Sequence, residues 1–183
     1  TPKPSSAASD VYKRQVMGLS AIYGMYAGVY HWFPKMYGRM MNKGLGYLHF
    51  WGTFICAYGV FFPMHFLGLA GLPRRYYQNS SFPMFDGLAD INAVITFFAL
   101  AGAVFQFIFI FNFYYSIFKG TKASKNPWQA NTLEWTTPVE RIHGNWPGEL
   151  PTVHRWAYDY SKPGADKDFI LQTEPLKEGE EEH

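Results

Sequence analysis

Uncharged stretches divide the chain into an apolar first part and a polar second part. Three spans contain no ionised side chain, at residues 16–33, 44–73 and 91–118. A bilayer core about 30 Å thick requires roughly 20 apolar residues in a helix, so the first span is short and the other two are long enough to cross. Lipid offers no hydrogen-bond partner to the backbone, which makes helix the expected structure. The pattern predicts transmembrane helices at about 16–34, 45–68 and 90–118.

Charge supports a division into a membrane domain, residues 16–118, and a tail, residues 119–183. The first contains seven charged side chains and the second nineteen. Basic residues in the 34–43 connector and just after residue 118 place these segments and the tail on the cytoplasmic side. A single cysteine, Cys56, excludes a disulfide scaffold, and a net charge of +2 gives no indication of nucleic-acid binding. We therefore expect an all-α membrane bundle with a polar tail.

The tail contains four tryptophans and is strongly acidic. Residues 126–183 carry five basic and eleven acidic side chains. Tryptophan at positions 128, 135, 146 and 156 is too frequent for a purely disordered segment. We expect an extended segment packed on the inner face of its own complex, with a solvated acidic end at 178–182.

Small and polar side chains indicate that the helices pack against one another. Gly24 and Gly28 form a GxxxG pattern, which permits close approach of two helices. In the third span a small and polar stripe is formed by Asn92, Thr96, Ala99, Ala103 and Gln106. Helix contact is the simplest interpretation of this stripe, and proton conduction by Thr96 or Gln106 is the alternative. Tyrosines and tryptophans near the first loop, Tyr30 among them, are typical of an interfacial aromatic belt.

The first fifteen residues do not fit the membrane pattern. Residues 5–15 read Ser-Ser-Ala-Ala-Ser-Asp-Val-Tyr-Lys-Arg-Gln, which matches one frame of a common transposase adapter used in sequencing libraries. We expect residues 1–15 to be a non-native segment, excluded from fold reasoning, with the native protein continuing upstream. A genuine polar N-terminus is the alternative.

Few residues in the sequence point to chemistry. The six histidines lack metal-binding spacing, and His49 and His65, sixteen residues apart on one helix, are about 24 Å apart along its axis. Asp90 is expected to cap the third helix, and Cys56 is expected to pack against other side chains.

The pair Arg74 and Arg75 is unusual, because positive charge outside the membrane opposes the insertion bias. Two adjacent guanidinium groups there require nearby anions, for which their planar forks are suited.

Three motifs resemble the haem–copper oxidases. They are His-Trp-Phe-Pro at 31–34, Phe-Phe-Pro-Met-His-Phe-Leu-Gly at 61–68, and Gly-Leu-Pro-Arg-Arg-Tyr at 71–76. Asn-Thr-Leu-Glu-Trp at 131–135 resembles bacterial members. Residues 16 to about 160 therefore resemble the C-terminal quarter of subunit I in those family members that oxidise cytochrome c.

The resemblance implies a twelve-helix subunit in which the three spans are helices ten to twelve. It also implies an oxidoreductase that passes electrons from cytochrome c through two haems to a copper-containing centre, reduces dioxygen to water and pumps protons. The implied partners are the remainder of subunit I, a copper-binding subunit II, subunit III, cytochrome c and a lipid bilayer. The bacterial plasma membrane is the expected location, with the mitochondrial inner membrane as the alternative.

By the same resemblance, Arg74 and Arg75 lie near the haem propionates. The histidines that ligate the haem irons would fall at positions that Tyr12 and Arg14 occupy. We therefore expect no catalytic residue and no metal ligand in this chain, and no activity from it alone. The alternatives are a quinol-oxidising subunit I and a non-enzymatic membrane protein.

Overall fold

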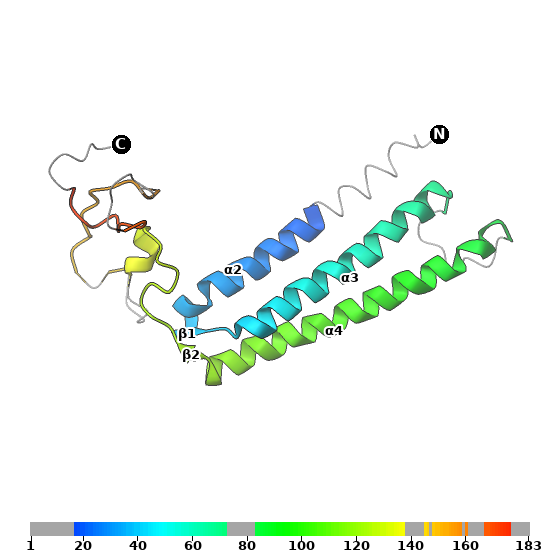
Figure 1. Ribbon diagram of the computed structural model, residues 1–183, viewed down its shortest axis with the longest axis horizontal. Helices are drawn as coiled ribbons and strands as arrows, with labels where there is room; N and C mark the ends of the chain where they lie inside the picture. The colour runs from blue at the N-terminus through cyan, green and yellow to red at the C-terminus, as the bar shows by residue number, and fades with distance from the viewer. Residues whose placement is uncertain are drawn as a thin grey trace. The chain divides into compact units, whose positions relative to one another are not determined.

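The computed structural model describes residues 17–72, 83–137, 145–146, 148–158, 160 and 167–176. Within them the chain forms two compact units, one from residues up to 31 and 41–120, the other from residues 32–40 and those after 120. The first unit is made by three helices, α2 (Leu19–Tyr37), α3 (Lys43–Leu69) and α4 (Ala89–Lys119), of which α2 continues into the second unit (Figure 1). The expected all-α membrane-type architecture is confirmed. Each helix ends one to three residues beyond its expected C-terminal bound, a difference typical of helix ends.

Local chemistry ends α2 and begins and ends α3. Gly38, with φ +66°, closes α2 by donating its N–H to the carbonyl of Pro34 at 2.8 Å. The side chain of Asn42 caps α3 by accepting from the N–H of Leu45 at 3.1 Å. At the far end of α3 Gly71 adopts φ +84° and the N–H of Leu72 bonds to the carbonyl of Leu67 at 3.0 Å. These are the bonds of a Schellman motif, which stops the helix just before the Arg74–Arg75 pair.

The start of α4 differs from the expectation. A 3₁₀ turn, η3 (Pro83–Leu88), leads into the helix, whose N-cap residue is Leu88 without a side-chain cap hydrogen bond. The prediction that Asp90 caps this helix is wrong, since Asp90 lies inside the first turn. A carboxylate in the first turn still stabilises the helix through the macrodipole, so the same residue acts by charge and not by capping.

Helices α3 and α4 run antiparallel and interlock through glycines. A Cβ atom placed on Gly52 would lie 2.2 Å from Cδ1 of Phe105, and one on Gly59 would lie 2.5 Å from Cγ of Phe98. Two phenylalanines spaced by seven residues thus fill two glycine positions spaced by seven. Between them a Cβ on Gly102 would lie 3.4 Å from Cβ of Cys56. Cys56 is buried in this contact, as predicted.

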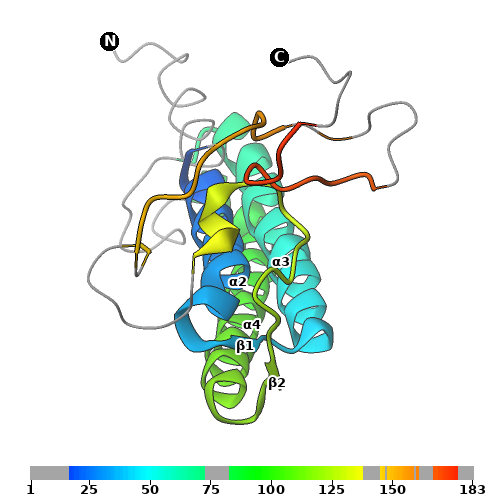
Figure 2. The ribbon, with the colours of Figure 1, turned by 90° about the vertical axis from the view of Figure 1, so that its left-hand side faces the viewer.

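The GxxxG glycine Gly24 does not make the close approach that the sequence suggested. Within the described chain, and apart from the adjoining residues and backbone of the same helix, no atom lies within 4 Å of a Cβ placed on Gly24 or on Gly18. Contact by α2 comes instead from its tyrosines, which pack on α3 and α4: the ring of Tyr26 lies 4.7 Å from that of His49 and 4.7 Å from that of Phe109. Figure 2 shows the three helices side by side.

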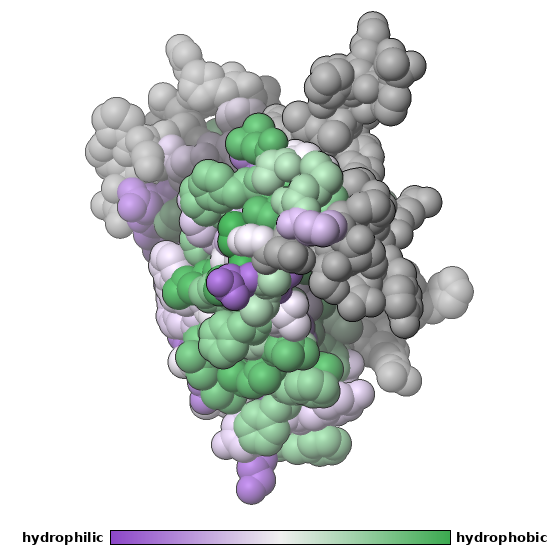
Figure 3. Space-filling model, turned by 90° about the vertical axis from the view of Figure 1, so that its right-hand side faces the viewer, coloured by the Kyte–Doolittle hydropathy of each residue, from purple (hydrophilic) through white to green (hydrophobic). Residues whose placement is uncertain are grey.

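Much of the apolar surface of the helical unit is not covered by the chain. Both α3 and α4 are long and apolar enough to cross a membrane, and only 22% and 6% of their apolar windows are buried. Figure 3, which views the end where α3 finishes and α4 begins, shows apolar side chains gathered on this surface. A core helix of a soluble protein would be mostly buried, so these faces suit lipid or other apolar protein.

The second unit has a small core around Trp135. Strand β1 (Arg39–Met40) pairs antiparallel with β2 (Thr121–Lys122), and the 3₁₀ helix η4 (Leu133–Thr136) follows. Trp135 is 3% exposed, and Nζ of Lys35 lies 5.4 Å from its ring centroid. Trp128 and Trp156 are exposed. One tryptophan of the tail therefore forms a core, and at least two do not.

Candidate functional site

The residues that the sequence marks for haem contact lie outside the described part of the chain. This holds for Arg74 and Arg75 and for the positions of Tyr12 and Arg14. The structure describes the chain past the end of α3 as far as Leu72, two residues before Arg74. Among the described residues, no group of three or more His, Cys, Asp and Glu side chains is placed to hold a metal ion.

A polar cluster lies inside the apolar helical unit, formed by Tyr26, Tyr30, His49, Thr53 and Gln106. Gln106 on α4 is its centre. Its Oε1 accepts a hydrogen bond from the Tyr26 hydroxyl and lies 3.4 Å from Nε2 of His49. Its Nε2 donates to Oγ1 of Thr53 at 3.1 Å and to the carbonyl of Gly102 at 3.3 Å. One amide side chain therefore joins all three helices.

The His49 ring is held on both nitrogens. It is only 2% exposed, and Nδ1 lies 3.5 Å from the Tyr30 hydroxyl. The Oε1 atom of Gln106 can only accept, so Nε2 of His49 carries the proton and Nδ1 accepts from Tyr30. The Phe109 ring lies 5.0 Å from the imidazole. Such partners satisfy a neutral histidine among apolar helices.

The cluster tests the prediction that the polar stripe of α4 makes contact with other helices. Gln106 packs against α2 and α3, which is the predicted helix contact. Thr96 instead donates to the carbonyl of Asn92 on its own helix at 2.8 Å and is exposed. Proton conduction by either residue stays a prediction. Tyr30, expected in an interfacial belt, faces the cluster; the spacing of Tyr23, Tyr26 and Tyr30 along one helical face was the signal for this.

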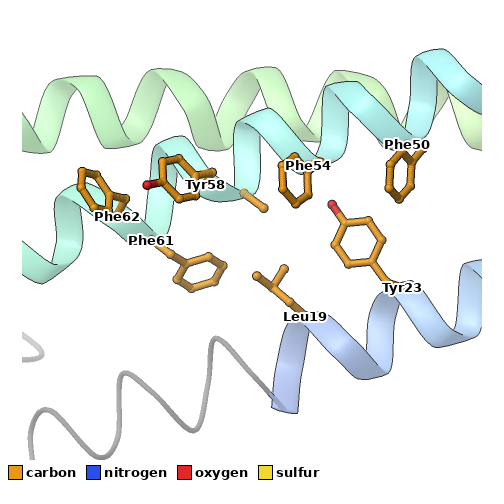
Figure 4. A pocket seen from close by; sticks show the side chains of 8 residues that line it. Leu19, Tyr23, Phe50, Phe54, Tyr58, Phe61 and Phe62 are labelled. Atoms are coloured by element: carbon orange, nitrogen blue, oxygen red, sulfur yellow. The ribbon is translucent and has the colours of Figure 1, made fainter.

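An aromatic groove of about 500 Å³ separates the start of α2 from α3. It is lined by Leu19 and Tyr23 of α2 and by Phe50, Phe54, Ala57, Tyr58, Phe61 and Phe62 of α3. Figure 4 shows Tyr23 reaching from α2 towards Phe54. The hydroxyl oxygen of Tyr23 is buried and has no hydrogen-bond partner among the described residues. The groove thus offers flat apolar walls, which suit a large apolar group, whereas the Tyr23 oxygen itself is closed off.

A family model described as cytochrome c and quinol oxidase polypeptide I matches residues 14–104 of the chain. This segment includes the aromatic groove and the α2 and α3 members of the polar cluster. The chain belongs to this oxidase polypeptide I family. Membership agrees with the apolar helices and with the motifs at 31–34, 61–68 and 71–76.

Curated relatives from bacteria agree with the family. The chain is 49% identical over 166 residues to the alternative cytochrome c oxidase subunit 1 of Bradyrhizobium diazoefficiens, covering 90% of the chain and 28% of that protein. It is 43% identical over 140 residues to cytochrome c oxidase subunit 1 of Thermostichus vulcanus, covering 76% of the chain and 24% of that protein. For the Synechocystis subunit 1 the identity is 42% over 156 residues, with 85% and 26% covered. The chain spans about a quarter of the length of these relatives.

Proposed function

We propose that the chain is part of the catalytic subunit of a terminal respiratory oxidase that takes electrons from cytochrome c, reduces dioxygen to water and pumps protons. The observation that carries this proposal is the 49% identity to a cytochrome c oxidase subunit 1 over 90% of the chain. The quinol oxidases share the family model, so they are the second candidate. The curated names above favour cytochrome c as the electron donor.

In this proposal the described residues lie at the periphery of a haem, and residues elsewhere in the intact subunit ligate iron and copper. The aromatic groove supports the peripheral role, because it offers apolar walls for a porphyrin face or an apolar substituent. When bound, haem and copper supply the electron-transfer and oxygen-reducing chemistry.

Arg74 and Arg75 complete this peripheral role in the proposal. The Schellman motif ends α3 at the edge of its apolar span, so the two guanidinium groups follow directly in sequence. Carboxylates of haem propionates would neutralise the pair and accept bidentate hydrogen bonds. The arginines would fix the orientation of the propionates and raise the reduction potential, since a nearby cation favours the state with more negative charge.

Partners and location follow from the same proposal. The uncovered faces of α3 and α4 would contact the remainder of subunit I and the lipid of a bacterial plasma membrane. Subunits II and III and cytochrome c would meet the intact subunit. With this chain alone we expect no activity.

Purification and redox titration of the intact parent oxidase test the proposal. We expect the optical spectrum of two haems, and we expect Arg74→Ala to leave both bound while shifting a haem potential downward. Arg39→Ala, on the opposite side of the membrane, is the matched control and should leave the potentials unchanged. A parent protein without haem would overturn the function. Unchanged potentials in Arg74→Ala would overturn only the propionate role.

A further inference from the structure

Asn112 of α4 pairs with the backbone at the start of α3. Its Oδ1 accepts from the backbone N–H of Asn42 at 3.2 Å, and its Nδ2 donates to the backbone carbonyl of Asn42 at 3.1 Å. The hydroxyl of Ser116 donates to the same Oδ1 at 3.1 Å, and Ser116 Oγ lies 3.3 Å from the Asn42 nitrogen. We call this group, Asn42, Asn112 and Ser116, the Asn112 clamp.

The two α4 side chains of the clamp are closed to solvent, and their pairing with Asn42 is specific in direction. Asn112 and Ser116 are both 0% exposed. A side-chain amide that both donates to and accepts from the backbone of one residue reproduces a backbone pairing, and it does so at only one axial position of α4. Leaving these hydrogen bonds unmade would be costly for the buried amide of Asn112. The clamp therefore opposes axial sliding of α4 along α3.

The clamp and the polar cluster are connected through α4, which carries residues of both. Within the cluster, the Tyr30 hydroxyl lies 3.5 Å from Nδ1 of His49. Gln106, six residues before Asn112 on α4, meets Nε2 of His49 at 3.4 Å. An axial shift of α4 would separate Gln106 from both His49 and Thr53.

We propose that Asn112 is a positioning residue: by holding the Asn42 peptide it sets the register of α3 and α4 that places Gln106 against His49. Nothing in this inference depends on the oxidase function. It concerns the arrangement of His49 and assigns Asn112 no contact with substrate or cofactor.

Cys56 provides a direct reporter of register. A Cβ on Gly102 would lie 3.4 Å from Cβ of Cys56, close to the mean of about 3.8 Å in disulfides. Because Cys56 is the single cysteine of the chain, Gly102→Cys gives one possible intramolecular disulfide. Its equilibrium yield in a glutathione redox buffer, with the full chain in lipid nanodiscs, measures the effective concentration of the two thiols. Nitrogen-15 shifts of the His49 ring report its hydrogen bonds in parallel.

Asn112→Leu removes the clamp while keeping similar side-chain volume. We expect the effective thiol concentration to fall on the order of tenfold, which corresponds to about 1.4 kcal/mol, and the His49 ring shifts to move. Thr96→Val is the matched control on the same helix, because Thr96 bonds only to the Asn92 carbonyl of its own helix and is exposed. It should change neither reading. Unchanged thiol concentration and ring shifts in Asn112→Leu overturn the proposal.

A second pair of variants keeps the test decisive if Asn112→Leu fails to fold. Asn42 is exposed and has φ −66°, which proline can adopt. Asn42→Pro removes both the N-cap side chain and the N–H that the clamp uses, whereas Asn42→Ala removes only the cap. We expect a lower disulfide yield in the proline variant than in the alanine variant. Equal yields in the two variants overturn the proposal.

Discussion

The α3–α4 pair and the second unit, called the C-terminal unit from here on, differ in whether they bury large aromatic side chains. On α3 the buried residues are small or polar, with one exception, and they are His49, Gly52, Thr53, Cys56 and Leu67. The large apolar residues of these helices, such as Phe54 and Phe107, are exposed. The C-terminal unit buries the ring of Trp135, and it also buries the polar side chains of Asn131 and Arg155.

The difference reflects the solvent of each unit. Moving a large apolar side chain from lipid into a contact between helices gives no hydrophobic gain. Close packing and hydrogen bonds therefore determine which residues make the contact. In water the gain from burying an aromatic ring dominates. The C-terminal unit also uses side-chain-to-backbone bonds: Arg155 donates from Nε to the carbonyl of Glu174 at 3.1 Å and from Nη2 to that of Pro175 at 3.0 Å.

The largest expected effect is on the core of the C-terminal unit. Trp135→Ala should destabilise that unit by about 3–5 kcal/mol, because it removes the side chain around which the unit packs. Hydrogen exchange of the tail amides, followed by mass spectrometry, measures the loss. Trp156→Ala is the control, since Trp156 is 59% exposed. Equal loss of protection in both variants would contradict a core formed by Trp135.

The glycine contact of the helix pair comes next. Gly52→Ala should weaken the α3–α4 contact by about 1–3 kcal/mol, because its Cβ would overlap the Phe105 ring. Gly24→Ala, in open space, should be neutral or slightly stabilising because alanine favours helix. Unfolding by sodium dodecyl sulfate in mixed micelles distinguishes the two. If both variants unfold alike, the overlap at Gly52 does not govern the contact.

A smaller effect is expected at Arg155. Arg155→Lys keeps the charge but loses the planar fork that serves two carbonyls, at a cost of about 1.5 kcal/mol. Exchange of the backbone amide of Glu174 reports the local opening. Lys167→Arg, on the exposed surface of the same unit, should leave it unchanged. Unchanged exchange of the Glu174 amide in Arg155→Lys, or faster exchange only in Lys167→Arg, would contradict the stabilising role of the Arg155 hydrogen bonds.

The smallest effect concerns the cation over Trp135. Lys35→Met removes the cation–π contact and the hydrogen bonds from Nζ to the carbonyls of Glu134 and Thr137. We expect a loss of about 1 kcal/mol in the stability of the C-terminal unit. Tryptophan fluorescence during urea titration measures it, with the exposed Lys43→Met as control. If Lys43→Met lowers the stability as much as Lys35→Met, the loss comes from removing a positive charge and not from the contacts of Lys35.

The sequence predicts the three helices well because absence of charge is a direct requirement of apolar surroundings. It predicts poorly which faces meet. The glycines at 24 and 28 matched a known packing pattern, yet a pattern on one helix does not identify the complementary large residue on another. Gly52 and Gly59 became meaningful only beside Phe105 and Phe98.

The candidate site was predictable to a similar extent. Gln106 followed from its place in a polar stripe, whereas Tyr30 was expected in an interfacial belt and Tyr26 was not singled out. The pairing of Asn112 with the peptide of Asn42 could not be predicted, since a backbone group leaves no mark in the sequence.

The two glycines and the two phenylalanines have the same spacing, so their contacts fit more than one alignment of α3 and α4. A slip of seven residues, about 10.5 Å, would bring Phe98 opposite Gly52 and repeat half of the interlock in a wrong alignment. The amide side chains of Gln106 and Asn112 do not recur with this spacing, so their hydrogen bonds distinguish the two alignments. The glycine and phenylalanine contacts thus stabilise the helix pair, and the amide groups select its alignment. A mutation of the first set weakens the pair, whereas a mutation of the second set allows more than one alignment.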